Sequence, residues 1–206
     1  MPITINGDGS IAGLSVGGLG SGVVNTATLA NGAASGSKLT MPTGSVIQTV
    51  HNFSNTKLES SDDFDIISAT ITPSSTSSKI LFIYNGNLAQ ENQSGNEWGL
   101  IAYRGSTALR LGRDKGTSNS RATFQAWGTD NRPARMDGTS NTSLTVNGIL
   151  VDEPNTTSAT TYKIAIEMFY TSGTQPIVKV GETGWDGSNI EQITNGYSLT
   201  LMEISG

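Results

Sequence analysis

Short apolar stretches separated by turn-forming clusters run along the chain from residue 44 to its end. Their content of β-branched and aromatic residues, and their spacing, predict β-strands rather than helices. We expect strands at residues 45–53, 64–72, 79–88, 98–103, 107–111, 123–127, 144–151, 161–170, 176–180 and 197–204. Such a series of short strands predicts an all-β, jelly-roll-like sandwich of two sheets.

Two of these stretches also predict where their strands lie. Residues 79–88 are apolar on both faces at their start, which is typical of a central strand. In residues 197–204, Leu199 and Leu201 alternate with Thr200 and Met202. We therefore expect one face of this last strand to be buried and the other to be able to meet a neighbouring subunit.

The first 43 residues lack the strand pattern. Nine of the first 40 are glycine, Asp8 and Lys38 are the only charged residues, and none is aromatic. Such a segment cannot offset its ordering entropy with a core of its own. Aliphatic residues recur between the glycines, so we expect an arm that becomes ordered against other copies or another protein, rather than a floppy tail. The candidate docking residues are Ile3, Ile5, Ile11, Leu14, Val16 and Leu19. Met41-Pro-Thr-Gly44 marks the boundary, giving an extended glycine-rich N-terminal arm at 1–43 and a sandwich domain at 44–206.

The composition of the chain argues against several classes of function. The chain has 12 Lys plus Arg against 17 Asp plus Glu, a net charge of −5, and the basic residues form no run. We therefore expect no nucleic-acid partner. Cysteine is absent, which excludes disulfides and thiolate chemistry. No stretch approaches about 18 unbroken apolar residues, so membrane insertion is not expected.

Candidate catalytic and metal-binding residues are sparse. His51 is the only histidine, and a structural role in a strand is favoured over metal binding or a catalytic triad. Ser61-Asp-Asp-Phe-Asp65 could supply oxygen ligands to calcium, but it lacks the glycine and distal glutamate of an EF-hand loop. A solvated turn leading into a strand is the favoured interpretation. Carboxylates in the loops could form a hydrolytic pair, although seventeen acids supply such pairs by chance. We expect no enzymatic activity, no catalytic or metal-binding residues and no cofactor.

The polar stretch from residue 90 to 142 is the predicted recognition region. It contains Trp98, Trp127 and several arginines, and aromatic rings beside Arg and Asp suit a glycan receptor. The alternative is that both tryptophans lie in the core or at a trimer contact. A third tryptophan stands in an apparent turn, Gly184-Trp-Asp-Gly187. The receptor-binding candidates are Trp98, Arg113, Trp127, Arg132, Arg135, Trp185 and Asp186.

Several segments resemble phage proteins. Residues 1–19, MPITINGDGSIAGLSVGGL, resemble the opening of many structural proteins from tailed phages of marine bacteria, cyanophages especially. Residues 28–39, TLANGAASGSKL, are similar to a repeat common in tail-fibre shafts. Residues 42–50, 69–81 and 199–204 also match, whereas residues 90–140 do not.

The resemblance implies a virion structural protein, assembled in the host cytoplasm. The first expectation is a homotrimeric tail-fibre or spike subunit whose arm binds another virion protein and whose loops adsorb to host surface glycan. One alternative is a capsid decoration protein that stabilises the shell. A polysaccharide depolymerase is a minor alternative.

Overall fold

The computed structural model describes residues 4–5, 11–12, 41–91, 98–109, 122–127, 144–169, 177–183, 193–194 and 196–206. The chain divides into two units, Met1–Met41 and Pro42–Gly206. In the first, β1 (Thr4–Ile5) and β2 (Ile11–Ala12) pair antiparallel, with Ile5 opposite Ile11. The regular structure in the described ranges consists of strands, which confirms the all-β prediction. None of these ranges contains a helix long and apolar enough to cross a membrane.

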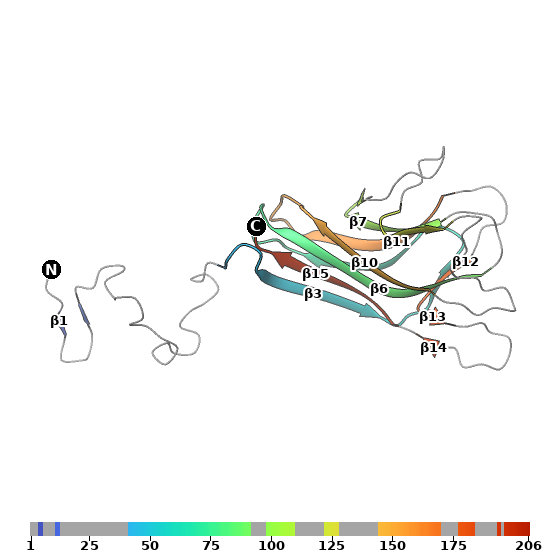
Figure 1. Cartoon of the computed structure of the whole chain (residues 1–206), viewed down its shortest axis with the longest axis horizontal. Coiled ribbons are helices and arrows are strands. Elements are labelled where there is room, and N and C mark those ends of the chain that lie inside the picture. The colour runs from blue at the N-terminus through green and yellow to red at the C-terminus, as the bar shows by residue number, and fades with distance from the viewer. Residues whose placement is uncertain are drawn as a thin grey trace. The chain divides into compact units, whose positions relative to one another are not determined.

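The second unit is built from two antiparallel sheets (Figure 1). The strands of the first sheet are β3 (Val46–Ser54), β15 (Tyr197–Ile204), β6 (Lys79–Glu91), β10 (Leu144–Asp152), β12 (Ile177–Val180) and β4 (Leu58–Ser60). Those of the second sheet are β5 (Phe64–Ile71), β11 (Thr160–Met168), β7 (Trp98–Arg104), β8 (Thr107–Ala108) and β9 (Gln125–Trp127). A small separate pair joins β13 (Glu182–Thr183) to β14 (Ile193–Thr194). As predicted, β6 is central, because β15 and β10 both bond to it.

The order of the strands is that of a jelly roll. Counted along the chain, β3, β5, β6, β7, β9, β10, β11 and β15 are strands one to eight. With the short strands β4, β8 and β12 left aside, the first sheet then has the order 1-8-3-6, and the second has the order 2-7-4-5. Two Greek keys that alternate between the sheets produce this order. The predicted jelly-roll-like sandwich is therefore confirmed.

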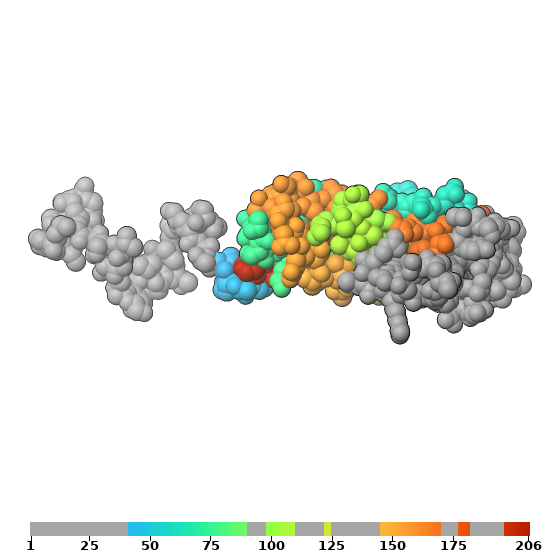
Figure 2. All heavy atoms as spheres, turned by 90° about the horizontal axis from the view of Figure 1, so that it is seen from above, coloured from blue at the N-terminus to red at the C-terminus, as the bar shows by residue number. Residues whose placement is uncertain are grey.

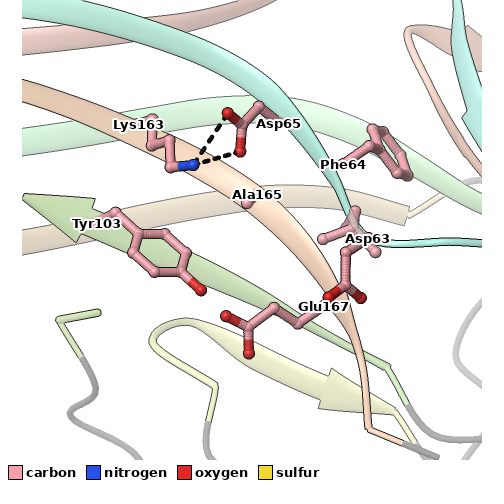
Figure 3. Close-up of a pocket in the computed structure, with 8 residues that line it drawn as sticks. Asp63, Phe64, Asp65, Tyr103, Lys163, Ala165 and Glu167 are labelled. Carbon is pink, nitrogen blue, oxygen red and sulfur yellow. Dashed lines mark hydrogen bonds and ion pairs between the residues drawn. The ribbon is translucent and has the colours of Figure 1, made fainter. Parts of the chain in front are cut away.

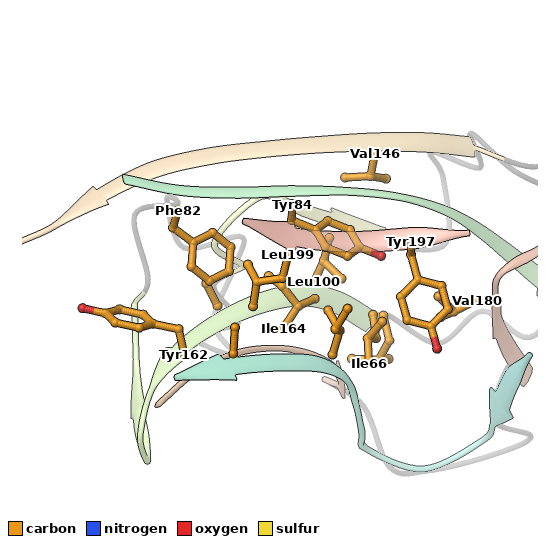
Figure 4. Close-up of a cluster of buried hydrophobic side chains, with 14 of the residues drawn as sticks. Ile66, Phe82, Tyr84, Leu100, Val146, Tyr162, Ile164, Val180, Tyr197 and Leu199 are labelled. Carbon is orange, nitrogen blue, oxygen red and sulfur yellow. The ribbon is translucent and has the colours of Figure 1, made fainter. Parts of the chain in front are cut away.

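The core lies between the sheets (Figure 4). Phe82, Tyr84 and Leu199 of the first sheet face Tyr162 and Ile164 of the second, and all five are fully buried. The Phe82 and Tyr162 rings meet edge to face, with their centroids 6.2 Å apart. Along β15, buried and half-buried residues alternate, as expected of a strand with one face in the core.

The predicted turn at Arg104-Gly-Ser joins β7 to β8 as an antiparallel hairpin. Gly105 has a φ of 57°, a left-handed conformation that glycine adopts without steric strain. Arg104 donates hydrogen bonds from Nη1 to both carboxylate oxygens of Asp152 at 2.9 Å, which ties the hairpin to β10. In the space-filling view, the yellow-green atoms of this hairpin lie at the surface beside orange atoms of residues 144–169 (Figure 2).

Candidate functional site

The outward face of the first sheet carries exposed aliphatic side chains. We call this surface the aliphatic face and define it by Leu81, Ile83, Ile149, Val151 and Met202. Strand register places Leu81 between Val151 and Met202, and Ile83 beside Ile149. Ile149 is 66% exposed and Val151 is 55% exposed, although both lie within a strand. Figure 1 shows the four strands that form this face, β3, β15, β6 and β10, side by side.

The aliphatic face carries no formal charge. The outward residues in register from Leu81 to Asn85 across these four strands include no Asp, Glu, Lys or Arg. His51 is their one titratable side chain, and its Nδ1 lies 2.8 Å from Thr200 Oγ1. Charges begin at the border, where Lys79 pairs with Glu153 at 3.0 Å. Burying this face against another surface would therefore require no desolvation of an Asp, Glu, Lys or Arg side chain.

The outward face of the second sheet is hollowed and charged (Figure 3). A cavity of about 420 Å³ opens here, lined by Asp63, Phe64, Asp65, Tyr103, Lys163, Ala165, Ile166 and Glu167. Ala165 is 4% exposed and lies between Lys163 and Glu167 along β11, so the smallest side chain forms the floor. A register shift between Ile164 and Ala165 brings Asp65 of β5 opposite Ala165.

An ion pair and a cation–π contact stabilise the upper part of this cavity. Lys163 Nζ donates to both carboxylate oxygens of Asp65, at 2.7 and 2.9 Å. The same ammonium group lies 4.9 Å from the centroid of the Tyr103 ring, a cation–π contact. These two contacts fix the orientation of the Tyr103 ring and of the Asp65 carboxylate.

The lower part of the cavity holds two carboxyl groups. Burial, and then the negative charge of Asp63, raises the pKa of Glu167 to about 7. Asp63 accepts a hydrogen bond from the backbone N–H of Met168 at 2.7 Å, which holds its carboxylate beside β11. At neutral pH, Glu167 is thus present both as a carboxylic acid and as a carboxylate.

A third cluster joins β3, β15 and the turn that precedes β6. Glu203 is fully buried and accepts four hydrogen bonds, at 2.6–2.7 Å. The donors are the backbone N–H and hydroxyl of Ser74, the hydroxyl of Ser78 and the side-chain amide of Gln48. Burial alone would raise the pKa of Glu203, but together these donors hold it below its ordinary value. We call these four residues the Glu203 clamp.

The Glu203 clamp joins three of the segments that were singled out in the sequence. Gln48 belongs to residues 42–50, Ser74 and Ser78 to 69–81, and Glu203 to 199–204. Beside the clamp, two backbone hydrogen bonds join Ser205 to residues 44 and 45: Gly44 N–H donates to Ser205 O at 2.8 Å, and Ser205 N–H donates to Ser45 O at 2.9 Å. The start of the sandwich domain is therefore held beside the end of the C-terminal strand.

The candidates predicted from sequence are only partly within the described residues. Trp98 is 2% exposed and packs in the core, which agrees with the alternative interpretation and removes it from the receptor-binding candidates. Trp127 ends β9 opposite Trp98, and its side chain lies outside the described set. Ile5 and Ile11 are paired in β1 and β2. The remaining candidates lie outside the described residues: Arg113, Arg132, Arg135, Trp185, Asp186, Ile3, Leu14, Val16 and Leu19.

The acidic turn follows the favoured interpretation. A bend at Ser61 and Asp62 leads into β5 at Phe64, and the Asp62 N–H donates to Ser60 Oγ at 2.9 Å. Within the described ranges, no group of three or more acidic or histidine side chains is arranged to hold a metal ion. The cavity itself was not predicted from the sequence, although Asp63 and Asp65 in its lining belong to the acidic segment 61–65.

Comparisons with known proteins gave similarities to solved structures but none to a family model or a curated sequence. No protein-family model matches it, and no curated protein sequence matches it significantly. Among solved structures, a chain in the structure of infectious bursal disease virus, Gt strain, is similar at 14% identity with a TM-score of 0.35, and the match covers 79% of this chain and 39% of that one. A chain from the Gx strain gives 12% identity and a TM-score of 0.31, covering 78% of this chain and 37% of that one. This chain thus spans well under half the length of these structural neighbours, and at such TM-scores the similarities give no basis for assigning function.

Proposed function

We propose that the protein is a virion structural protein that functions as a homotrimer. Its arm attaches the subunit to another virion protein, its jelly-roll domains associate through the aliphatic face, and its remaining surface contributes to adsorption on the host. The aliphatic face is the observation that carries this proposal. The resemblance of the arm and of the clamp segments to phage structural proteins supports the virion setting.

The occupant of the aliphatic face in this proposal is another copy of the chain. Each subunit carries a net charge of −5, so copies repel one another through most of their surface. The aliphatic face is free of that repulsion, and β10, among the described strands, bonds only to β6 and so lies at a sheet edge. Exposed aliphatic side chains on an edge strand are a ready surface for pairing between chains. Threefold packing would bring Ile149 and Val151 of three subunits together near the axis.

The test is the oligomeric state of the purified full chain by sedimentation velocity. We expect a trimer in the wild type and a monomer in Ile149→Asp/Val151→Asp, because burying six carboxylates per trimer is strongly unfavourable. Ser68→Asp/Thr70→Asp introduces the same charges, at the same spacing, on exposed positions of β5 and should leave the trimer intact. Ile149→Thr/Val151→Thr, which keeps β-branching, should weaken the trimer without unfolding the strand. A monomeric wild type, or an unaltered trimer in the Asp variant, would overturn the role of this face.

The place of the trimer on the particle is a separate question with a direct measurement. Cryo-EM of the intact particle should show this chain at a tail fibre or spike. Density on the capsid lattice would instead support the decoration protein, in which the arm and not the outer surface carries the function.

A further inference from the structure

We propose that the cavity on the second sheet is a binding site for a neutral, hydroxyl-rich saccharide. This inference deepens the proposed adsorption function and rests on it for its biological setting. It names a site on the strands β5, β7 and β11, to which the polar stretch of residues 90–142, where the sequence placed recognition, contributes Tyr103.

The cavity has the form of a small-ligand site. Its volume of about 420 Å³ lies in the range of about 300–1,000 Å³ that is usual for such sites. The floor is the methyl group of Ala165, and the polar groups stand around it (Figure 3). Three different strand segments supply them: Asp63 and Asp65 at β5, Tyr103 on β7, and Lys163 with Glu167 on β11.

The polar groups select the class of ligand. Three carboxyl groups against one ammonium disfavour phosphates, nucleic acids and acidic sugars. The positive charge of Lys163 is moreover already shared with Asp65. Carboxylates accept hydrogen bonds from hydroxyl groups, and an aromatic ring packs against the apolar face of a pyranose. The Tyr103 ring and the acids around Ala165 together offer both kinds of contact.

A second concavity adjoins the first and indicates a ligand longer than one sugar ring. It has a volume of about 480 Å³ and is lined by Asn52, Phe53, Ser54, Asp65, Ile66, Ile67 and Ser68. Asp65 lines both hollows and therefore stands between them. Phe53, which is 60% exposed, provides a second aromatic surface in this hollow. An oligosaccharide bound across Asp65 would contact one ring in each hollow.

The experiment is saturation-transfer difference NMR on the full chain, with neutral trisaccharides of glucose, galactose and N-acetylglucosamine as probes. We expect transfer to at least one of them in the wild type. Asp65→Asn should weaken binding about tenfold, because it removes the negative charge and replaces one of the two acceptor oxygens shared by both hollows with an N–H₂ donor. Ala165→Leu should abolish binding by filling the floor. The matched control is Glu59→Gln, an exposed acid on β4 outside both hollows.

The outcomes separate this site from the proposed trimer. Because Ala165 is buried, Asp65→Asn keeps the test valid if Ala165→Leu does not fold. Absence of transfer from every neutral probe, transfer only from a sialylated trisaccharide, or unchanged binding in Asp65→Asn would each overturn the site. Sedimentation of the same samples reports the trimer independently. A trimer that binds no sugar therefore overturns only this inference, and a monomer that binds sugar overturns only the trimer.

Discussion

The two sheets of the sandwich carry a buried and a half-buried carboxyl group in opposite surroundings. On the first sheet, Glu203 is enclosed by four hydrogen-bond donors, and its pKa is lowered. On the second sheet, Glu167 lies beside Asp63, and its pKa is raised to about 7. Burial raises the pKa of both groups, so the neighbours determine the sign. The four donors stabilise Glu203 as an anion, and their hydrogen bonds stabilise the fold. Glu167, in contrast, can gain or lose a proton near neutral pH.

The outer faces of the sheets differ in a parallel way. The first sheet presents uncharged aliphatic residues, a surface suited to another protein surface. The second presents a hollow lined by ionisable groups, which suits a small polar ligand. Association is thus assigned to the outer face of the first sheet and the hollow around Ala165 to that of the second, so that trimer formation through the first sheet would leave this hollow accessible.

The largest effect on this comparison is expected from Glu203→Gln. The substitution removes the anion and places an amide N–H₂ against that of Gln48, so buried donors lose their acceptor. We expect a loss of about 2–4 kcal/mol in the free energy of unfolding, measured by urea denaturation. Glu153→Gln, at a side chain that is 63% exposed, should change stability by less than about 0.5 kcal/mol.

Two further observations sharpen the test of Glu203. Adding Gln48→Glu to Glu203→Gln exchanges donor and acceptor and should recover part of the loss. Because the folded pKa of Glu203 is lowered, its contribution is present above the ordinary value of 4.5 and disappears as the pH falls through the folded value. The wild type should therefore lose more stability than the variant between neutral pH and acid. Equal stability of wild type and Glu203→Gln at pH 7 would contradict the clamp.

The sequence predicted the strands far better than these polar clusters. Strand periodicity depends on residues two apart, so residues 197–204 alone indicated that Leu199 and Leu201 are buried. The same alternation puts Glu203 on the buried face, a signal that could have identified it. Its partners Gln48 and Ser74 are more than a hundred residues away in the chain, so the clamp itself becomes visible only in the folded structure.

The cavity was harder still to predict. Asp63 and Glu167 meet only because β5 and β11 are neighbours, and the register shift at Ala165 determines which side chains surround the floor. Sequence periodicity does not encode a bulge of this kind. Trp98 shows a different limit of sequence analysis. Composition alone cannot distinguish an aromatic residue of the core, as Trp98 is, from one at a binding surface.

A smaller and opposite effect is expected from Glu167→Gln. The folded pKa of about 7 lies above the ordinary value of 4.5, so ionisation of Glu167 opposes folding. The wild type has its full stability from this group below pH 4.5 and loses it as the pH rises through about 7. Glutamine remains neutral, so the variant should be more stable than the wild type at pH 8.5 and equal to it at pH 4, measured by urea midpoints. The gain should be smaller than the loss in Glu203→Gln, because water screens a half-buried group. A difference that is the same at both pH values would show that charge is not its cause.

The smallest effect is expected when the charge of Asp63 alone is removed, which tests how much that charge raises the pKa of Glu167. Asp63→Asn removes the negative charge while its side-chain oxygen can still accept the Met168 N–H. The pKa of Glu167 should fall below 7 but stay above 4.5, because burial is the larger cause of the shift. A ¹³C NMR titration of the Glu167 carboxyl group measures this directly, with Asp62→Asn, in the exposed turn, as the control that leaves it unchanged. If Asp63→Asn leaves the pKa at about 7, burial alone raises it. In that case the charge of Asp63 would not contribute to the raised pKa of Glu167. The two sheets would then differ only in whether hydrogen-bond donors surround the carboxyl group.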